Sequence, residues 1–202
     1  MSTPPTLLLI RHGQTSWNAL RRVLGRTDIP LDATGCGQAV ALGSVMGEVD
    51  RIYSSPLIRA RATAELAFPG RSLTLIDDLT EMDQGELEGL ESHELGTRFG
   101  PLLERWNADP GEVRLPGGET MNEVRDRALL ALGEIAASAR PGERVAVVTH
   151  QLVLSAVLTA LAGEPTSAWR TRTHGNTHWS QVSWGSPPTL QAFRLAPHLP
   201  NS

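Results

Sequence analysis

The chain has 202 residues, of which 40% are hydrophobic and 20% are charged, a balance typical of a globular domain with a sizeable core. Its formal net charge of -4 excludes the basic surplus of proteins that follow a nucleic-acid backbone, so we predict no nucleic-acid partner. An anionic small molecule is compatible with this charge if a local cluster of cationic side chains holds it.

Cysteine usage and the first apolar run both bear on the compartment. Cys36 is the only cysteine, so no internal disulfide can form, which suits a reducing compartment. The apolar run at 7–10 follows no basic leader and is too short for a secretory core or a membrane span. We therefore expect a cytoplasmic protein that does not engage a membrane.

In the first half of the chain, short apolar runs alternate with segments in which apolar residues recur at helical spacing. The expected elements are strands at 7–10, 51–55 and 73–76 and helices at 32–46 and 56–66. The first helix begins near Asp32 or Thr34, because both residue types are good N-caps. The second helix begins at Pro56, because proline suits a first helical turn.

The second half continues this alternation after one interruption. The expected elements are helices at 104–107, 121–139 and 152–161 and strands at 144–149, 181–184 and 190–194. Thr120 and Glu123 have the spacing of a capping box. Residues 83–118 are rich in Gly, Pro and Glu and break the rhythm. We predict a three-layer α/β/α sandwich with a mainly parallel central sheet, formed by a single domain over 1–202 with a small helical insertion or lid at about 83–118.

Side chains suited to phosphoryl chemistry follow the predicted strands, at the edge where open α/β sheets bind ligands. His12 and His150 each follow a strand, Arg59 and Arg61 lie in the first turns of a helix, and Glu81 follows the third strand. A neutral imidazole can attack phosphorus, guanidinium groups can pair with its oxygens, and a carboxyl group with a raised pKa can protonate the leaving oxygen. Because arginines can supply the positive charge, we expect neither a metal nor another cofactor.

Five sequence blocks containing these residues occur in a defined order. They are 11–15 with Trp17 and Asn18; 25–31; 54–64; 79–89; and 115–120 with 147–150. Together they resemble the motifs of the histidine phosphatase superfamily, in its phosphoglycerate mutase-like branch. The similarity extends from residue 7 to about residue 195, and five ordered blocks are far more specific than the tripeptide Arg11-His12-Gly13 alone.

The resemblance implies a metal-independent phosphomonoesterase that hydrolyses a small phosphorylated metabolite through a phosphohistidine on His12. It implies that Glu81 is the proton donor and later the base, and that Arg11, Arg59 and His150 hold the phosphate. It places Asn18 on the phosphoryl group, and at the mouth of the site it places Gln14, Thr15 and Gly25. Because relatives often dimerise, a homodimer is compatible with the resemblance.

Two positions depart from the family pattern. Gln151 follows the second site histidine, where the family usually has glycine, so its side chain either crowds the phosphate or adds a hydrogen bond to it. We therefore count Gln151 among the substrate-binding residues. Leu87 stands in the acid-bearing loop where the family often has an aromatic residue.

Two other functions are compatible with the same residues. A phosphomutase would return the phosphate to another hydroxyl of the substrate, as in the phosphoglycerate mutases of this family. The dedicated bacterial mutases have an added segment in the insertion region, and the shortness of this chain there favours hydrolysis. A non-catalytic binder of phosphorylated ligands is disfavoured by the joint presence of His12, Arg59, Glu81 and His150.

Several candidate residues also have simpler interpretations. A lone histidine at a strand end is usually structural, and only the block pattern favours catalysis by His12. Helical spacing puts Arg59 and Arg61 on different faces, so only one of them can point at the site. His174 and His178 are four residues apart, as in some metal pairs, but Gly175 between them argues for a loop.

Overall fold

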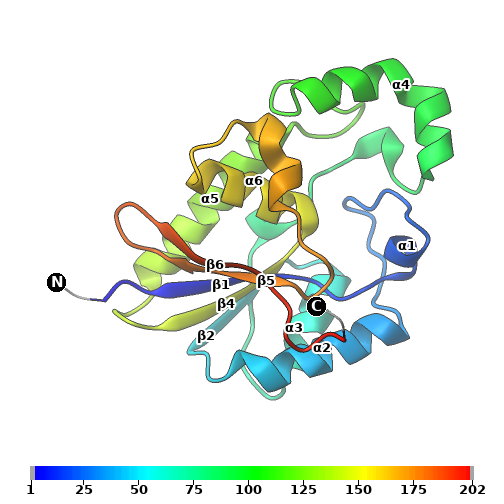
Figure 1. The fold of residues 1–202 in the computed structure, drawn as a ribbon. Coiled ribbons are helices and arrows are strands. Elements are labelled where there is room, and N and C mark those ends of the chain that lie inside the picture. Colours follow the sequence, from blue (N-terminus) through cyan, green and yellow to red (C-terminus); the bar gives the residue numbers. More distant parts are fainter. Residues whose placement is uncertain (1–2, 201–202) are drawn as a thin grey trace.

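The computed structural model describes residues 3–200, which form a six-stranded sheet with helices on both faces (Figure 1). The strands are β1 (Thr6–Arg11), β2 (Arg51–Ser54), β3 (Thr74–Leu75), β4 (Arg144–Thr149), β5 (Trp179–Ser183) and β6 (Thr189–Leu195). They lie in the order β3-β2-β4-β1-β5-β6. The first four are parallel to one another, whereas β5 and β6 are antiparallel additions at one edge. The predicted α/β/α sandwich with a mainly parallel sheet is confirmed.

Alternating side chains of β1 belong to two separate apolar layers. Leu7 and Leu9 pack on one face of the sheet, and Leu8 and Ile10 pack on the other; all four are fully buried. The first face is covered by α5 (Met121–Ser138) and α6 (Gln151–Leu161), and the second by α2 (Ala33–Met46) and α3 (Ile58–Ala67) (Figure 1). A strand covered on both faces requires this kind of uninterrupted apolar run.

Two helix starts show what the sequence can and cannot predict. Asp32 is the N-cap of α2, and its side chain accepts a hydrogen bond from the backbone N–H of Gly35 at 2.8 Å. The predicted start at Pro56 is wrong, because α3 begins at Ile58. The backbone N–H of Ile58 instead donates to Asp28 Oδ1 at 2.8 Å, so a distant loop satisfies the first turn of this helix.

Five further helices lie toward the carboxyl ends of the parallel strands, and Figure 1 labels α1 and α4 among them. They are α1 (Ser16–Ala19), η1 (Asp77–Leu79), η2 (Gly85–Leu87), α4 (Ser92–Ala108) and η3 (Thr166–Arg172). We call η2, α4 and η3 the roof, because side chains of all three line one cavity. The sequence predicts only 104–107 of α4 as helical; the helix is longer and is kinked at Phe99 (φ −128°), just before Pro101. Residues 83–118, the predicted insertion, supply η2 and α4.

The start of α5 agrees with its prediction from the sequence. The capping box predicted for Thr120 and Glu123 is present at the start of α5, where the Thr120 side chain accepts a hydrogen bond from the backbone of Glu123. Over the part of the chain that the structure describes, no helix is both long enough and apolar enough to cross a membrane.

Candidate active site

Two histidines lie side by side where the central strands end. Because β1 and β4 pair in parallel with Arg11 opposite Thr149, the next residues, His12 and His150, emerge at the same edge. Their ring centroids are 5.1 Å apart, and both side chains are almost completely buried. The sheet register therefore fixes the spacing of the two imidazoles.

The local geometry of His12 leaves one ring nitrogen free to react. Nδ1 lies 2.7 Å from the carbonyl oxygen of Gly13, which can only accept a hydrogen bond, so Nδ1 carries the proton and Nε2 carries the lone pair. Burial lowers the pKa of His12 well below 6.5, and the positive charges of Arg59 and Arg11 lower it further. The imidazole is therefore neutral around pH 7, as a nucleophile must be.

Arg11 and Arg59 place two guanidinium groups near this ring. Arg59 is fully buried and donates to the carbonyl oxygens of Gly25 at 2.6 Å and Thr27 at 3.0 Å; Arg11 donates to the carbonyl of His174 at 2.6 Å. Burial lowers the pKa of Arg11 to about 10, which leaves it charged around pH 7. Within residues 3–200 neither guanidinium forms a salt bridge with a carboxylate, and the Nε atoms of both are buried without a hydrogen-bond partner. These features suit a bound anion.

His150 is also held in one orientation. Its Nε2 lies 2.7 Å from the hydroxyl of Ser55, and its Nδ1 is buried without a partner. Burial, followed by the charge of Arg59, lowers the pKa of His150 well below 6.5. When the Ser55 hydroxyl donates to Nε2, the neutral ring carries its proton on Nδ1 and can donate it to an anion.

Glu81 supplies a carboxyl group that is only 3% exposed. Its Oε1 accepts the backbone N–H of Met82 at 2.9 Å, and both of its oxygens lie 3.2 Å from the backbone nitrogen of Leu152. Burial raises its pKa, although these backbone contacts and the nearby arginines oppose the shift. A buried carboxyl group with a raised pKa can act as a general acid.

A cavity of about 210 Å³ brings five of the predicted site residues together, whereas Arg59 and His150 do not line it. Arg11, His12, Asn18, Glu81 and Gln151 all line it. The side-chain oxygen of Asn18 already accepts two hydrogen bonds from Thr15, one from its backbone N–H and one from its hydroxyl, both at 3.1 Å. The NH₂ group of Asn18 is therefore the part of the side chain that can donate to a ligand. Gln151 accepts the backbone N–H of His174 at 3.1 Å, so the extra side chain at this position ties a loop to the cavity wall.

The three residues predicted at the mouth do not line this cavity and instead make contacts that hold neighbouring parts of the site in place. Gln14 donates from its side chain to Asp32 at 3.0 Å, Thr15 is fully buried and caps α1, and the carbonyl of Gly25 holds Arg59. Arg61 points away from the site and pairs with Glu65 at 3.6 Å on the outer face of α3, as helical spacing predicts.

The structure gives roles to three residues to which the sequence analysis assigns none, although two of them lie in the block at 54–64. Ser55 orients His150; Thr63 accepts the backbone N–H of Gly13 at 2.9 Å; and Asn176 donates to the carbonyl of His12 at 3.1 Å. Ser55 stands at a strand end, so its position is a usable signal. The contacts of Thr63 and Asn176 span 50 and 164 residues, and no local pattern reveals such pairs.

The assembled groups match the needs of phosphoryl transfer. A neutral imidazole, two arginines, a second imidazole and a protonatable carboxyl group provide a nucleophile, charge stabilisation and an acid. In the described part of the chain, no three His, Cys, Asp or Glu side chains form a cluster suited to a metal ion, and His174 and His178 lie in or beside a loop.

Comparison with known proteins gives consistent results. A family model described as histidine phosphatase superfamily (branch 1) matches residues 7–190. The "Uncharacterized phosphatase PhoE" of Bacillus subtilis is 36% identical over 159 residues, which cover 77% of this chain and 76% of the relative. A "Probable phosphoglycerate mutase GpmB" of Salmonella paratyphi B is 34% identical over 168 residues, covering 81% and 77%.

A solved structure extends the similarity to the whole fold. Phosphoserine phosphatase from Entamoeba histolytica, in complex with 3-phosphoglyceric acid, superposes with a TM-score of 0.86 at 26% identity. The match covers 97% of this chain and 100% of the other. The block pattern, the sheet order and these matches all lead to the same family.

Proposed function

Because this chain belongs to the histidine phosphatase superfamily (branch 1) and is a phosphatase, we propose that it hydrolyses a small phosphomonoester through a phosphohistidine on His12. The observation that carries this proposal is the hydrogen bond from His12 Nδ1 to the carbonyl of Gly13, at 2.7 Å. It makes Nε2 the unprotonated nitrogen, in a cavity that Arg11 and Glu81 also line.

The first step transfers the phosphoryl group to the protein. The Nε2 lone pair of His12 attacks phosphorus in line with the leaving oxygen, and the P–O ester bond breaks as the P–N bond forms. Glu81 gives its proton to the leaving oxygen, so that a neutral alcohol departs. Arg11, Arg59 and His150 stabilise the charge on the other phosphoryl oxygens, and the NH₂ group of Asn18 adds a donor.

The second step returns the protein to its starting state. Water attacks phosphorus, the Glu81 carboxylate takes a proton from it, and the P–N bond breaks with its electron pair returning to His12 Nε2. Inorganic phosphate leaves, and both side chains regain their original protonation. One carboxyl group can serve both steps because its raised pKa brings the acid and base forms closer in energy.

The nucleophile is tested by trapping the intermediate. The wild type is mixed with a labelled phosphomonoester and quenched rapidly during turnover, without acid. Labelled phosphate that is stable to base and labile to acid is expected to remain on the protein. The variant His12→Ala is expected to carry no label, and its kcat with 4-nitrophenyl phosphate is expected to fall by about a thousandfold or more. His93→Ala is the matched control, since His93 is 77% exposed on α4, and it is expected to retain both. Activity of His12→Ala within tenfold of wild type refutes the assignment.

Phosphoglycerate mutase activity is the second candidate, because a relative of this chain bears that name. Hydrolysis ranks first because other relatives are named as phosphatases, and because this chain is short in the region where the dedicated bacterial mutases of the family have an added segment. An assay with 3-phosphoglycerate separates the two: isomerisation without release of phosphate reverses the ranking.

We also propose that the protein acts in the cytoplasm and on a small molecule instead of a nucleic acid. Its one cysteine, Cys36, is exposed as a free thiol, which suits a reducing compartment. The net charge of -4 gives no support to a nucleic-acid partner. The homodimer stays a prediction from the family resemblance.

A further inference from the structure

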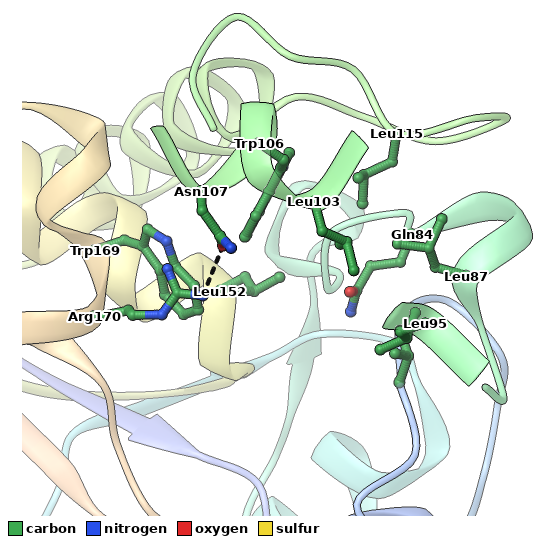
Figure 2. A pocket seen from close by; sticks show the side chains of 11 residues that line it. Gln84, Leu87, Leu95, Leu103, Trp106, Asn107, Leu115, Leu152, Trp169 and Arg170 are labelled. Atoms are coloured by element: carbon green, nitrogen blue, oxygen red, sulfur yellow. Dashed lines mark hydrogen bonds between the residues drawn. The ribbon is translucent and has the colours of Figure 1, made fainter. Parts of the chain in front are cut away.

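A second cavity, of about 260 Å³, lies beside the catalytic one and is mostly apolar (Figure 2). Eight of its eleven lining residues are Val, Leu or Trp. Gln84, Leu152 and Trp169 line both cavities, so the two share a wall. Together, their volumes fall within the range of about 300–1,000 Å³ that is usual for small-molecule sites.

The roof gives this cavity its apolar walls. The kink in α4 lets both halves of the helix contribute, Leu95 from the first half and Leu103 with Trp106 from the second (Figure 2). Trp106 meets Trp169 of η3 edge to face, with ring centroids 5.5 Å apart. Because these contacts hold α4 against η3, the cavity is a defined space between packed elements.

Polar side chains are few among the lining residues, and two of them already donate hydrogen bonds within the protein. Arg170 stacks over the ring of Trp169 at 4.4 Å and donates to Asn107 at 2.8 Å, the bond drawn as a dashed line in Figure 2. Gln84 donates from its side chain to the carbonyl of Leu24 at 3.2 Å. The indole N–H groups of Trp106 and Trp169 are buried without a hydrogen-bond partner, and they can each donate one bond to a ligand. A sugar-like group with several hydroxyls would lose water against every wall of the cavity and gain only a few hydrogen bonds in return, which is unfavourable.

We propose that this cavity binds the leaving group of the substrate, and that the substrate is the phosphomonoester of an apolar alcohol. This inference rests on the proposed function, because the phosphate must sit beside His12 for its ester group to enter the adjoining cavity. Apolar walls stabilise alkyl or aryl groups in proportion to the surface they remove from water.

A series of primary alkyl phosphates tests the proposal on the wild-type protein. Methyl, butyl and hexyl phosphate have leaving alcohols of similar acidity, so chain length changes burial and leaves the chemistry almost constant. We expect kcat/KM to rise about threefold to fourfold for each methylene that enters the cavity. Propyl phosphate is expected to exceed glycerol 1-phosphate by at least about tenfold, because the latter brings two hydroxyls into apolar surroundings.

Two variants of α4 locate the effect. Leu103→Trp fills the cavity and is expected to remove the preference for hexyl over methyl phosphate, measured as the ratio of their kcat/KM values. Leu102→Trp is the matched control, since Leu102 is the adjacent leucine and does not line the cavity. It is expected to keep the wild-type preference.

The outcomes separate this inference from the proposed function. The apolar leaving group is refuted if kcat/KM does not change with alkyl chain length, or if glycerol 1-phosphate is preferred over propyl phosphate. Either result counts even when phosphohistidine forms on His12. Equal effects of Leu103→Trp and Leu102→Trp also refute it. If Leu103→Trp loses methyl phosphate turnover as well, the alkyl series on the wild type alone decides. Failure to hydrolyse any ester or to trap phosphate refutes the proposed function.

Discussion

The Thr63 hydroxyl connects two parts of the site that are far apart in the sequence, the loop at Gly13 and the helix turn at Arg59. Removing this hydroxyl tests directly how the two parts are held together. The Thr63 hydroxyl accepts the backbone N–H of Gly13 at 2.9 Å and donates to the carbonyl of Arg59 at 2.7 Å. Thr63 is fully buried, so water cannot replace either bond. Thr63→Val keeps the shape of the side chain and removes both hydrogen bonds.

The expected loss of stability follows from the group that this change leaves unpaired. A buried N–H without a partner costs about 1–3 kcal/mol, and here the N–H of Gly13 becomes such a group. The carbonyl of Arg59 adds little, because it lies inside α3, where backbone amides also reach carbonyls. For a chain of this size, the cost corresponds to a fall in Tm of about 2–12 °C. Urea unfolding followed by tryptophan fluorescence measures the free energy, and a thermal scan measures the Tm.

Thr97→Val is the matched control. The hydroxyl of Thr97 also donates to a carbonyl one turn earlier, that of His93 at 2.9 Å, but it does so on the exposed surface of α4. Its loss is expected to change the free energy of unfolding by less than about 0.5 kcal/mol. If Thr63→Val and Thr97→Val unfold at the same urea concentration, the coupling through Thr63 is refuted.

Three further outcomes are expected. The pH profile of kcat/KM is expected to have an acidic limb below pH 6.5, because burial and the arginines lower the pKa of His12. It is expected to have an alkaline limb above pH 4.5, because burial raises the pKa of Glu81, and Glu81→Gln is expected to remove this limb. An acidic limb above pH 6.5 contradicts the reasoning. Arg127 donates to the carbonyl of Glu81 at 3.2 Å, so Arg127→Met is expected to lower kcat with butyl phosphate about tenfold to a hundredfold by displacing the acid. Arg125→Met, on the same helix, is the control, and equal losses in the two variants contradict a positioning role for Arg127. Activity with 4-nitrophenyl phosphate survives EDTA, because arginines supply the positive charge; loss that zinc or magnesium restores contradicts this.

Local patterns predict the central strands and the residues at their ends. The apolar run at 7–10 ends near His12, and the run at 145–148 leads to His150, so the sequence alone places both histidines at one edge of the sheet. The choice of Arg59 over Arg61 follows from helical spacing combined with the family pattern, and the buried position of Arg59 agrees with it.

Long-range contacts and glycine-rich segments limit the prediction elsewhere. The start of α3 depends on Asp28, which lies 30 residues away from Ile58, so Pro56 is a misleading signal. In α4, Gly96 and Gly100 lower the apparent helix propensity, and packing of the helix against η3 and the core offsets this cost. The sequence does not predict the apolar cavity, because its walls come from six separate stretches of the chain that meet only after folding.

Because β1 pairs with β4, the stability of the catalytic geometry and the choice of substrate depend on different parts of the molecule. A slip of one residue would exchange the faces of β1, so that Leu7 and Leu9 would enter the layer that now packs around Leu8 and Ile10. Both layers would have to repack, so the register that sets the distance between the two site histidines is as durable as the core itself. The roof contributes little to that register. Substitutions in α4 or η3 can therefore exchange one alcohol for another while the transfer machinery stays intact, which makes the roof the natural segment to vary in a library that seeks new substrates.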